Sequence, residues 1–210
     1  MRKWEVVSAI VAAGVVPVLR ADSTDKAVRL IEAIAAGGVQ TIEVTMTVPG
    51  ALQTLEKAAS TGLLVGAGTV LDAETARLCI MQGAEYVVTP GFFPEVIRMA
   101  HRYQKPALVG CQTITEITQA MESGADIIKL FPGSHLGPEF LKAVRGPLPQ
   151  APCMPTGGVS LTTVKPWIEA GAVAVGVGGE LTGPAAKGDY AAVTSLARQF
   201  IAALKEARHE

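Results

Sequence analysis

A lysine lies within a short apolar segment of the chain, DIIKLF at residues 126–131. If this segment is a buried β-strand, Lys129 carries an ammonium group into a place where desolvation is unfavourable unless the group is paired or neutral. A buried amine is a potential nucleophile: in its neutral form it attacks a carbonyl carbon, and the protonated imine that results withdraws electrons from a neighbouring bond.

A glutamate has a similar position in TIEVTM, residues 41–46. Because side chains alternate between the two faces of a strand, Glu43 and Lys129 can both face the interior of one barrel. Alone, either charge could be a surface residue with only its aliphatic part packed. Together they favour a functional site, since each would otherwise be a buried charge without a partner. Burial favours the neutral form of Lys129, whereas a nearby ionised glutamate favours its protonated form. The sequence does not determine which of the two effects is larger.

The elements that must position these residues follow a regular alternation of strands and helices. Eight apolar segments rich in Val and Ile have the pattern of buried strands: residues 15–20, 41–46, 63–69, 85–90, 106–111, 126–131, 152–158 and 172–178. Parallel strands joined by helices form either an open doubly wound sheet or a closed barrel. The turn LRADSTD after the first strand lacks the glycines expected of a nucleotide-binding open sheet. We therefore predict an α/β protein, a (β/α)8 TIM barrel in a single domain over residues 1–210, with a short N-terminal helix at residues 3–13 below the barrel.

Several predicted helices have residues typical of a first turn. Thr113 and Glu116 have the spacing of a capping box, and other helices are expected to begin beside Ser23, Asp72 and Pro94. Pro166 lies inside LTTVKPWIEAGA and is expected to kink that helix or to delay its start.

Polar residues and glycines at the strand ends are candidates for substrate binding, because barrel enzymes bind substrates at the C-terminal ends of their strands. Arg20 ends the first strand, where it could bind a carboxylate or phosphate or could be only an exposed charge. Thr69 and Thr156 supply hydroxyl groups at two other strand ends, although threonine is common there without any function. Glycines follow or end the last two strands and either bind phosphate through backbone N–H groups or only form turns: Gly157, Gly158, Gly176, Gly178 and Gly179.

Composition argues against several other classes of protein. The formal net charge of −1 is made of scattered charges, so we expect no nucleic-acid partner. The three cysteines, Cys79, Cys111 and Cys153, contain no CxxC pair, and the three histidines have no metal-ligand spacing, so we expect neither disulfides nor a metal, and no cofactor. The apolar segment at residues 6–19 is interrupted by Gly14 and Pro17, which argues against a signal peptide or a membrane span. A cytoplasmic protein is expected.

Five segments together resemble one protein family. EVTMTVPGAL, VGAGTV, TPG, KLFPG and PTGGV occur here in an order and spacing similar to those of bacterial 2-keto-3-deoxy-6-phosphogluconate/4-hydroxy-2-oxoglutarate aldolases. The resemblance covers nearly the whole chain. It implies a class I (Schiff-base) aldolase with a trimeric barrel fold that cleaves 2-keto-3-deoxy-6-phosphogluconate into pyruvate and glyceraldehyde 3-phosphate. Cleavage of 4-hydroxy-2-oxoglutarate into pyruvate and glyoxylate is a second implied reaction.

The resemblance also implies roles for residues of this chain. It makes Lys129 the Schiff-base residue and Glu43 the general acid/base, acting through a water. It surrounds the substrate with Arg20, Thr69, Pro90, Phe131 and Thr156, and brings Gly157 and Gly158 to the phosphate. Gly178 and Gly179, after the last strand, are expected to join them.

Two positions depart from the family pattern. Many members have an arginine four residues after the glutamate, where this chain has Thr47, and many have a serine in the loop after strand eight, where this chain has Gly179 and Glu180. Both changes are compatible with imine chemistry but leave the keto acid open. The alternatives are an aldolase for 2-keto-3-deoxy-6-phosphogalactonate, a phosphosugar isomerase or epimerase without an imine, and a barrel that only binds a ligand or serves as an assembly subunit.

Overall fold

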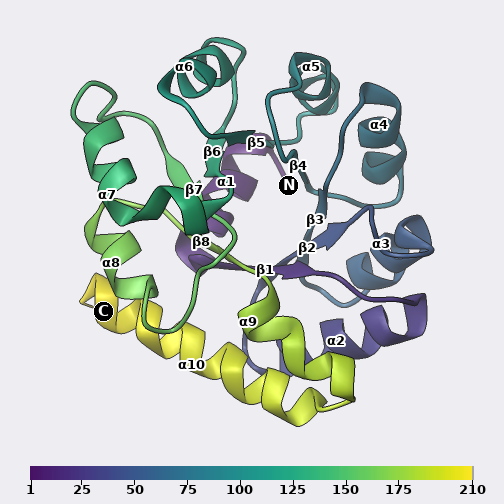
Figure 1. The fold of residues 1–210 in the computed structure, drawn as a ribbon. Coiled ribbons are helices and arrows are strands. Elements are labelled where there is room, and N and C mark those ends of the chain that lie inside the picture. Colours follow the sequence, from purple (N-terminus) through teal and green to yellow (C-terminus); the bar gives the residue numbers. More distant parts are fainter. Residues whose placement is uncertain (210) are drawn as a thin grey trace.

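The computed structural model describes residues 1–209 and contains a ring of parallel strands surrounded by helices (Figure 1). The strands are β1 (Val15–Leu19), β2 (Thr41–Thr45), β3 (Leu64–Gly68), β4 (Tyr86–Val88), β5 (Ala107–Cys111), β6 (Ile127–Leu130), β7 (Cys153–Pro155) and β8 (Val175–Val177). The helices are α1 (Lys3–Ala13), α2 (Thr24–Ala36), α3 (Ala51–Ala59), α4 (Ala73–Met81), α5 (Pro94–Arg102), α6 (Ile114–Glu122), α7 (Gly133–Arg145), α8 (Val164–Glu169), α9 (Gly179–Thr182) and α10 (Tyr190–Arg208), with a 3-10 helix η1 (Gly183–Lys187).

The strand order is β7-β6-β5-β4-β3-β2-β1-β8, so each strand lies beside its neighbours in sequence and β8 returns to β1. The remaining edge, between β7 and β8, is joined by one isolated parallel bridge between Thr156 and Gly176. This closure confirms the predicted (β/α)8 barrel and excludes an open doubly wound sheet.

Two separate apolar cores stabilise the barrel. Residues on the outer face of the strands, such as Ile128 and Leu130, pack against the surrounding helices. Residues on the inner face, such as Ile127 and Tyr86, pack against α1 in a second cluster that includes Val6 and Ile10. Burial of these apolar side chains is the main favourable contribution to folding.

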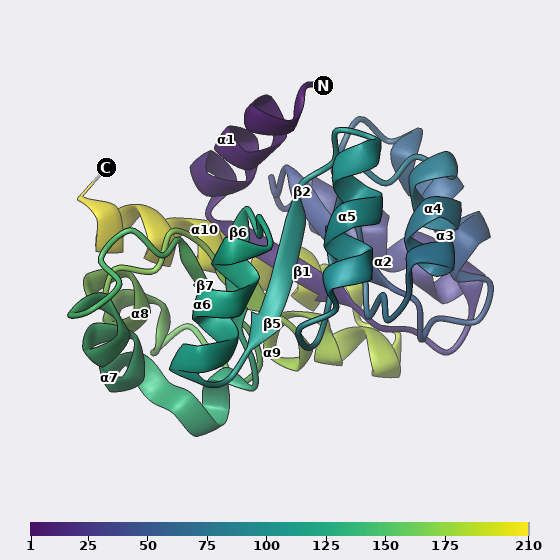
Figure 2. The ribbon, with the colours of Figure 1, turned by 90° about the horizontal axis from the view of Figure 1, so that it is seen from above.

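Helix α1 lies across one end of the ring, as Figure 2 shows. Its apolar residues Val6 and Ile10 are completely buried, and it ends at Gly14, whose φ of +65° favours glycine. The predicted helix at residues 3–13 is therefore confirmed as a plug for one end of the barrel, which leaves the other end for a site.

The observed strands are shorter than the sequence predicted. The seventh was expected over residues 152–158 but ends at Pro155, because Gly157 and Gly158 turn the chain with φ values of +88° and +74°. The eighth was expected over residues 172–178 but begins only at Val175. The register of side chains is unaffected by these differences, so the predicted inner and outer faces hold.

The predicted helix starts are confirmed. Ser23 and Asp72 each accept a hydrogen bond from an amide of the following turn, and Thr113 and Glu116 form the expected capping box. Helix α8 begins at Val164, so that Pro166 lies in its first turn. Amide groups in the first turn have no hydrogen-bond partner within the helix, so a proline, which lacks the N–H group, is tolerated there.

Candidate active site

Lys129 on β6 and Glu43 on β2 meet inside the barrel. The Lys129 Nζ group donates a hydrogen bond of 3.4 Å to Glu43 Oε1, and both side chains are buried, with 5% of the lysine and none of the glutamate exposed. Nζ also lies 5.3 Å from the centre of the Phe131 ring. The predicted inward orientation of both charged residues is confirmed.

The glutamate fits inside the barrel because β3 is rich in glycine. In the β2–β3 ladder, Glu43 is opposite Gly66 and Thr45 is opposite Gly68. A Cβ atom at Gly68 would overlap the Glu43 carboxylate. The sequence segment VGAGTV contains this glycine, but nothing in the sequence indicated that it makes room for the carboxylate.

Two buried oxygens near the barrel interior have no hydrogen-bond partner within the described residues: Glu43 Oε2 and Thr156 Oγ1. Thr156 is 4% exposed, and its hydroxyl lies against the Cα of Gly176, where a side chain would overlap it. A buried polar group without a partner is unfavourable by about 1–3 kcal/mol. Both oxygens can therefore hydrogen-bond to a substrate or to a water inside the barrel.

Pro90 follows β4 and is fixed by contacts that the sequence did not indicate. The hydroxyl of Thr89 donates to the carbonyl of Gly91 at 2.6 Å and accepts from the amide of Gly110 at 3.2 Å. A side chain at Gly110 would collide with the Pro90 backbone. Because Gly110 is opposite Lys129 in the β5–β6 ladder, this loop is held at the end of the strand next to the lysine.

Thr69, the residue after β3, has a φ of +59°. A β-branched residue rarely adopts this left-handed conformation, which is unfavourable by about 1–3 kcal/mol and occurs preferentially at functional sites. The strained backbone supports the choice of Thr69 as a candidate for substrate contact.

Arg20 is connected to β2 by a short chain of hydroxyl groups. Its Nη1 donates to Thr47 Oγ1 at 3.4 Å, and the hydroxyls of Thr47 and Thr45 are 2.8 Å apart. Thr45 in turn donates to the carbonyl of Leu19 at 2.9 Å. Thr47 is thus the residue that contacts Arg20, which directly follows β1.

The glycines predicted for phosphate binding fall into two groups. Gly157 lies beside the Phe131 ring: a Cβ atom added to this glycine would be 3.5 Å from the ring. Gly158 faces Ser134 at the start of α7. Gly178 and Gly179 follow β8, where an added Cβ would meet no atom within 4 Å.

One glycine of the predicted set belongs elsewhere. Gly176 is buried within β8 and makes room for Thr156, so it is not part of a phosphate loop. Glu180 is exposed, so its charge is not buried beside these glycines.

The cysteines are poor candidates for nucleophiles. Burial raises the pKa of the thiols of Cys79, Cys111 and Cys153 to about 12, so all three stay protonated at neutral pH. Among residues 1–209, no three His, Cys, Asp or Glu side chains are grouped so that they could bind a metal ion together. No helix in the same part of the chain has the length and hydropathy needed to cross a membrane.

The fold and the site define a (β/α)8-barrel protein whose most distinctive feature is a buried lysine–glutamate pair. The model of the family "Aldolase: KDPG and KHG aldolase" matches residues 6–196. The chain belongs to this family of KDPG and KHG aldolases.

Named relatives share most of the chain. The 2-dehydro-3-deoxy-phosphogluconate aldolase of Pseudomonas aeruginosa is 35% identical over 93% of this chain and 91% of its own length. The 2-dehydro-3-deoxy-6-phosphogalactonate aldolase of Escherichia coli is 33% identical over 79% of this chain and 83% of its own. A solved KDPG aldolase of Legionella pneumophila, with pyruvate captured as a covalent carbinolamine intermediate, has a TM-score of 0.82 at 27% identity, covering 92% of this chain and 96% of that one.

Proposed function

We propose that this protein is a class I aldolase that cleaves 2-keto-3-deoxy-6-phosphogluconate into pyruvate and glyceraldehyde 3-phosphate through an imine on Lys129. The proposal rests chiefly on one observation: a buried lysine amine lies within 3.4 Å of a buried carboxylate inside the barrel. The carbinolamine held by the Legionella relative supports it, because a carbinolamine is the adduct of an amine and a carbonyl group.

The reaction begins when the neutral Lys129 amine adds to the C2 carbonyl of the keto acid. The carbinolamine loses water and becomes a protonated imine. The proton of the C4 hydroxyl leaves to a base, the C3–C4 bond breaks, and its electron pair moves toward the imine nitrogen, which releases the aldehyde and leaves an enamine. Protonation of the enamine at C3 and addition of water then release pyruvate and restore the amine.

Glu43 is the proposed general acid/base of these steps. One of its oxygens accepts a hydrogen bond from Lys129, while the other, Oε2, has no partner within the described residues. The free oxygen can accept a proton, directly or through a water, and can return it to the enamine carbon. A single carboxylate beside the lysine therefore suffices for both transfers.

The remaining contacts are assigned by position. The residues proposed to surround the keto acid are Arg20, Thr69, Pro90, Phe131 and Thr156, and those proposed to bind the phosphate are Gly157, Gly158, Gly178 and Gly179. With threonine at position 47, the carboxylate is bound by other donors, such as Thr69 or backbone amides. Thr45, the third donor considered, already donates its hydroxyl proton to the carbonyl of Leu19.

Borohydride reduction in the presence of pyruvate tests the imine. We expect one reduced pyruvate to be attached to Lys129, located by peptide mass spectrometry, and no modification of Lys129→Ala. A protein that is not modified, or a Lys129→Ala variant that is modified equally, would overturn the proposal in favour of an isomerase, an epimerase or a barrel that only binds ligands.

A second candidate is cleavage of 2-keto-3-deoxy-6-phosphogalactonate, favoured by the Escherichia coli relative of that name. The two substrates differ in configuration at C4, the carbon whose hydroxyl loses its proton. Comparing kcat/KM for both sugars, and for 4-hydroxy-2-oxoglutarate as an unphosphorylated keto acid, distinguishes the candidates.

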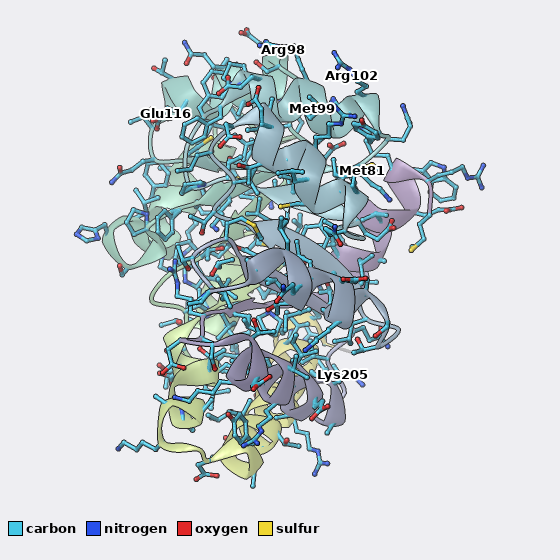
Figure 3. All side chains as sticks on the ribbon, turned by 90° about the vertical axis from the view of Figure 1, so that its right-hand side faces the viewer. Met81, Arg98, Met99, Arg102, Glu116 and Lys205 are labelled. Atoms are coloured by element: carbon cyan, nitrogen blue, oxygen red, sulfur yellow. The ribbon has the colours of Figure 1, made fainter. Side chains whose placement is uncertain are left out.

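We also propose that residues 1–210 form one domain that assembles as a homotrimer in the cytoplasm. An apolar surface on two neighbouring helices supports assembly: Leu78 and Met81 on α4 are 54% and 66% exposed, and Met99 lies on α5 beside Arg98 and Arg102 (Figure 3). Light scattering should give a mass three times that of one chain. The mass should be lower for a Leu78→Glu/Met81→Glu variant.

The proposed location in the cytoplasm is supported by the three free thiols, which are suited to a reducing compartment.

A further inference from the structure

Two glycines on the inner face of β3 leave two spaces beside Glu43. Glu43 is opposite Gly66 in the β2–β3 ladder, and Gly68 is the next inward-facing residue of β3. The carboxylate fills the space at Gly68, where an added Cβ atom would overlap it, and is in contact there with Lys129. The space at Gly66 lies about 6.6 Å away along the strand, so a carboxylate that turned into it would lose this contact.

The aromatic ring of Tyr86, on β4, fills the second space. Tyr86 is opposite Gly66 in the β3–β4 ladder, and a Cβ atom added to Gly66 would overlap the ring. The side chain of Tyr86 is completely buried and belongs to the inner apolar cluster that contains Val6 and Ile10 of α1. The ring therefore occupies the space into which the Glu43 carboxylate would otherwise turn.

The hydroxyl group of Tyr86 anchors the ring to β2. Thr41 donates its one hydroxyl proton to the carbonyl of Leu64 at 2.9 Å, so the phenol is the donor in the 3.0 Å hydrogen bond between Tyr86 and Thr41. Thr41 precedes Glu43 by two residues and faces the same way, so this bond holds the strand that carries the carboxylate. The pKa of the phenol is raised above its ordinary value of 10, chiefly by burial and also by the charge of Glu43. The phenol therefore stays protonated at neutral pH and serves as a donor.

We propose that Tyr86 is a positioning residue for the reaction, which confines the Glu43 carboxylate to its place beside Lys129. It does so by filling the space at Gly66, which leaves the carboxylate the space at Gly68. The inference rests on the proposed aldolase function and extends it from the buried pair to the aromatic ring next to it. Because Lys129 is carried by β6, loss of the ring leaves the amine able to form an imine, whereas proton transfer by Glu43 is impaired.

Two measurements with pyruvate alone separate the roles of the pair. Borohydride trapping reports the imine on Lys129. Exchange of the pyruvate methyl protons in deuterated water, followed by NMR, reports Glu43, because the imine loses a methyl proton to the carboxylate and the resulting enamine takes up a deuteron. Tyr86→Leu should lower the exchange rate by about one hundredfold, the effect of displacing a catalytic group by about 1 Å, and should leave trapping at the wild-type level.

Phe200→Leu is the matched control for this substitution. Phe200 is an equally buried aromatic residue, but it lies on α10 in the outer core. Its replacement removes the same kind of side chain without opening a space beside Glu43. Both exchange and trapping should match the wild type when they are expressed per folded chain.

Two further variants test the ring itself. Tyr86→Phe keeps the ring and loses one hydrogen bond, so exchange should stay within about tenfold of the wild type. In Gly66→Ala/Tyr86→Leu the new methyl group enters the space that the ring has left, and exchange should recover by at least about tenfold over Tyr86→Leu, a coupling expected of residues in contact.

The outcomes separate this inference from the aldolase function. Normal exchange in Tyr86→Leu, an equal fall of exchange and trapping, a hundredfold loss in Tyr86→Phe, or no recovery in the double variant would each overturn the role of Tyr86. A wild-type protein that neither traps pyruvate nor exchanges its protons would overturn the aldolase function, on which the inference rests.

Discussion

Gly68 lies directly against the carboxylate of Glu43, on the neighbouring strand of the barrel. The absence of a side chain at this position is what allows a glutamate to turn inward beside Lys129. The catalytic geometry proposed for this chain therefore depends on a residue that has no functional group.

Gly68→Ala should lower kcat by about one hundredfold, because even a displacement of about 1 Å of a catalytic group has an effect of that size. The added methyl group would occupy the place of the Glu43 carboxylate. Steady-state kinetics check the prediction. Gly183→Ala is the control, since a Cβ there meets no atom within 4 Å. Equal kcat in both variants would show that the carboxylate can move without consequence.

Glu43→Gln should lower turnover by roughly two to four powers of ten, the usual contribution of a general acid/base. Trapping of pyruvate on Lys129 by borohydride should persist, because the amine and the barrel are unchanged. Rapid-quench kinetics and mass spectrometry measure the two effects separately. Glu139→Gln, an exposed carboxylate on α7, should match the wild type, and normal turnover of Glu43→Gln would remove Glu43 from its proposed role.

The buried pair should reduce stability rather than increase it. Glu43→Leu leaves the Lys129 ammonium buried without a partner, and loss of one member of a buried pair destabilises a protein by about 3–5 kcal/mol. In Lys129→Met/Glu43→Leu both charges are absent, so its free energy of unfolding should equal or exceed that of the wild type, although it is inactive. Urea denaturation of the two single variants and the double variant measures the coupling. Purely additive effects would contradict a direct interaction between the two residues.

Glu116 should contribute to stability at neutral pH and lose that contribution in acid. Hydrogen bonds from the amide of Gln112, and then from Thr113, hold the pKa of Glu116 below its ordinary value of 4.5. A carboxyl whose pKa is lower in the folded state stabilises the fold above its unfolded pKa, and the contribution disappears as the pH falls through the folded pKa. The difference in unfolding free energy between wild type and Glu116→Gln should be largest above about pH 5 and should shrink below it. A difference that does not vary between pH 3 and pH 7 would contradict this account.

The barrel and its central pair could be predicted from local patterns. Alternation along DIIKLF and TIEVTM placed Lys129 and Glu43 on the inner face, because a strand in a given register has only two faces. Contacts between the side chains of neighbouring strands were not predictable in this way. The space beside Gly68, the link between Arg20 and Thr47, and the hydroxyl of Thr89 that fixes Pro90 depend on how far one strand is shifted along the next, which side-chain alternation does not determine. Strand ends were predicted too long where residues of strand-like composition, such as those at 172–174, only lead into the sheet.

The junction of β7 and β8 has one β-bridge, between Thr156 and Gly176, and a backbone hydrogen bond from the amide of Val173 to the carbonyl of Cys153. The β2–β3 ladder, by comparison, has five residue pairs. The glycine loops proposed to bind the phosphate lie on both sides of this junction. A bound phosphate ester would therefore hydrogen-bond to both loops and connect β7 to β8. Amide hydrogens around the junction should therefore exchange fastest in the empty barrel and more slowly when substrate is bound. The closure of the barrel at this junction would then be stabilised by the ligand itself.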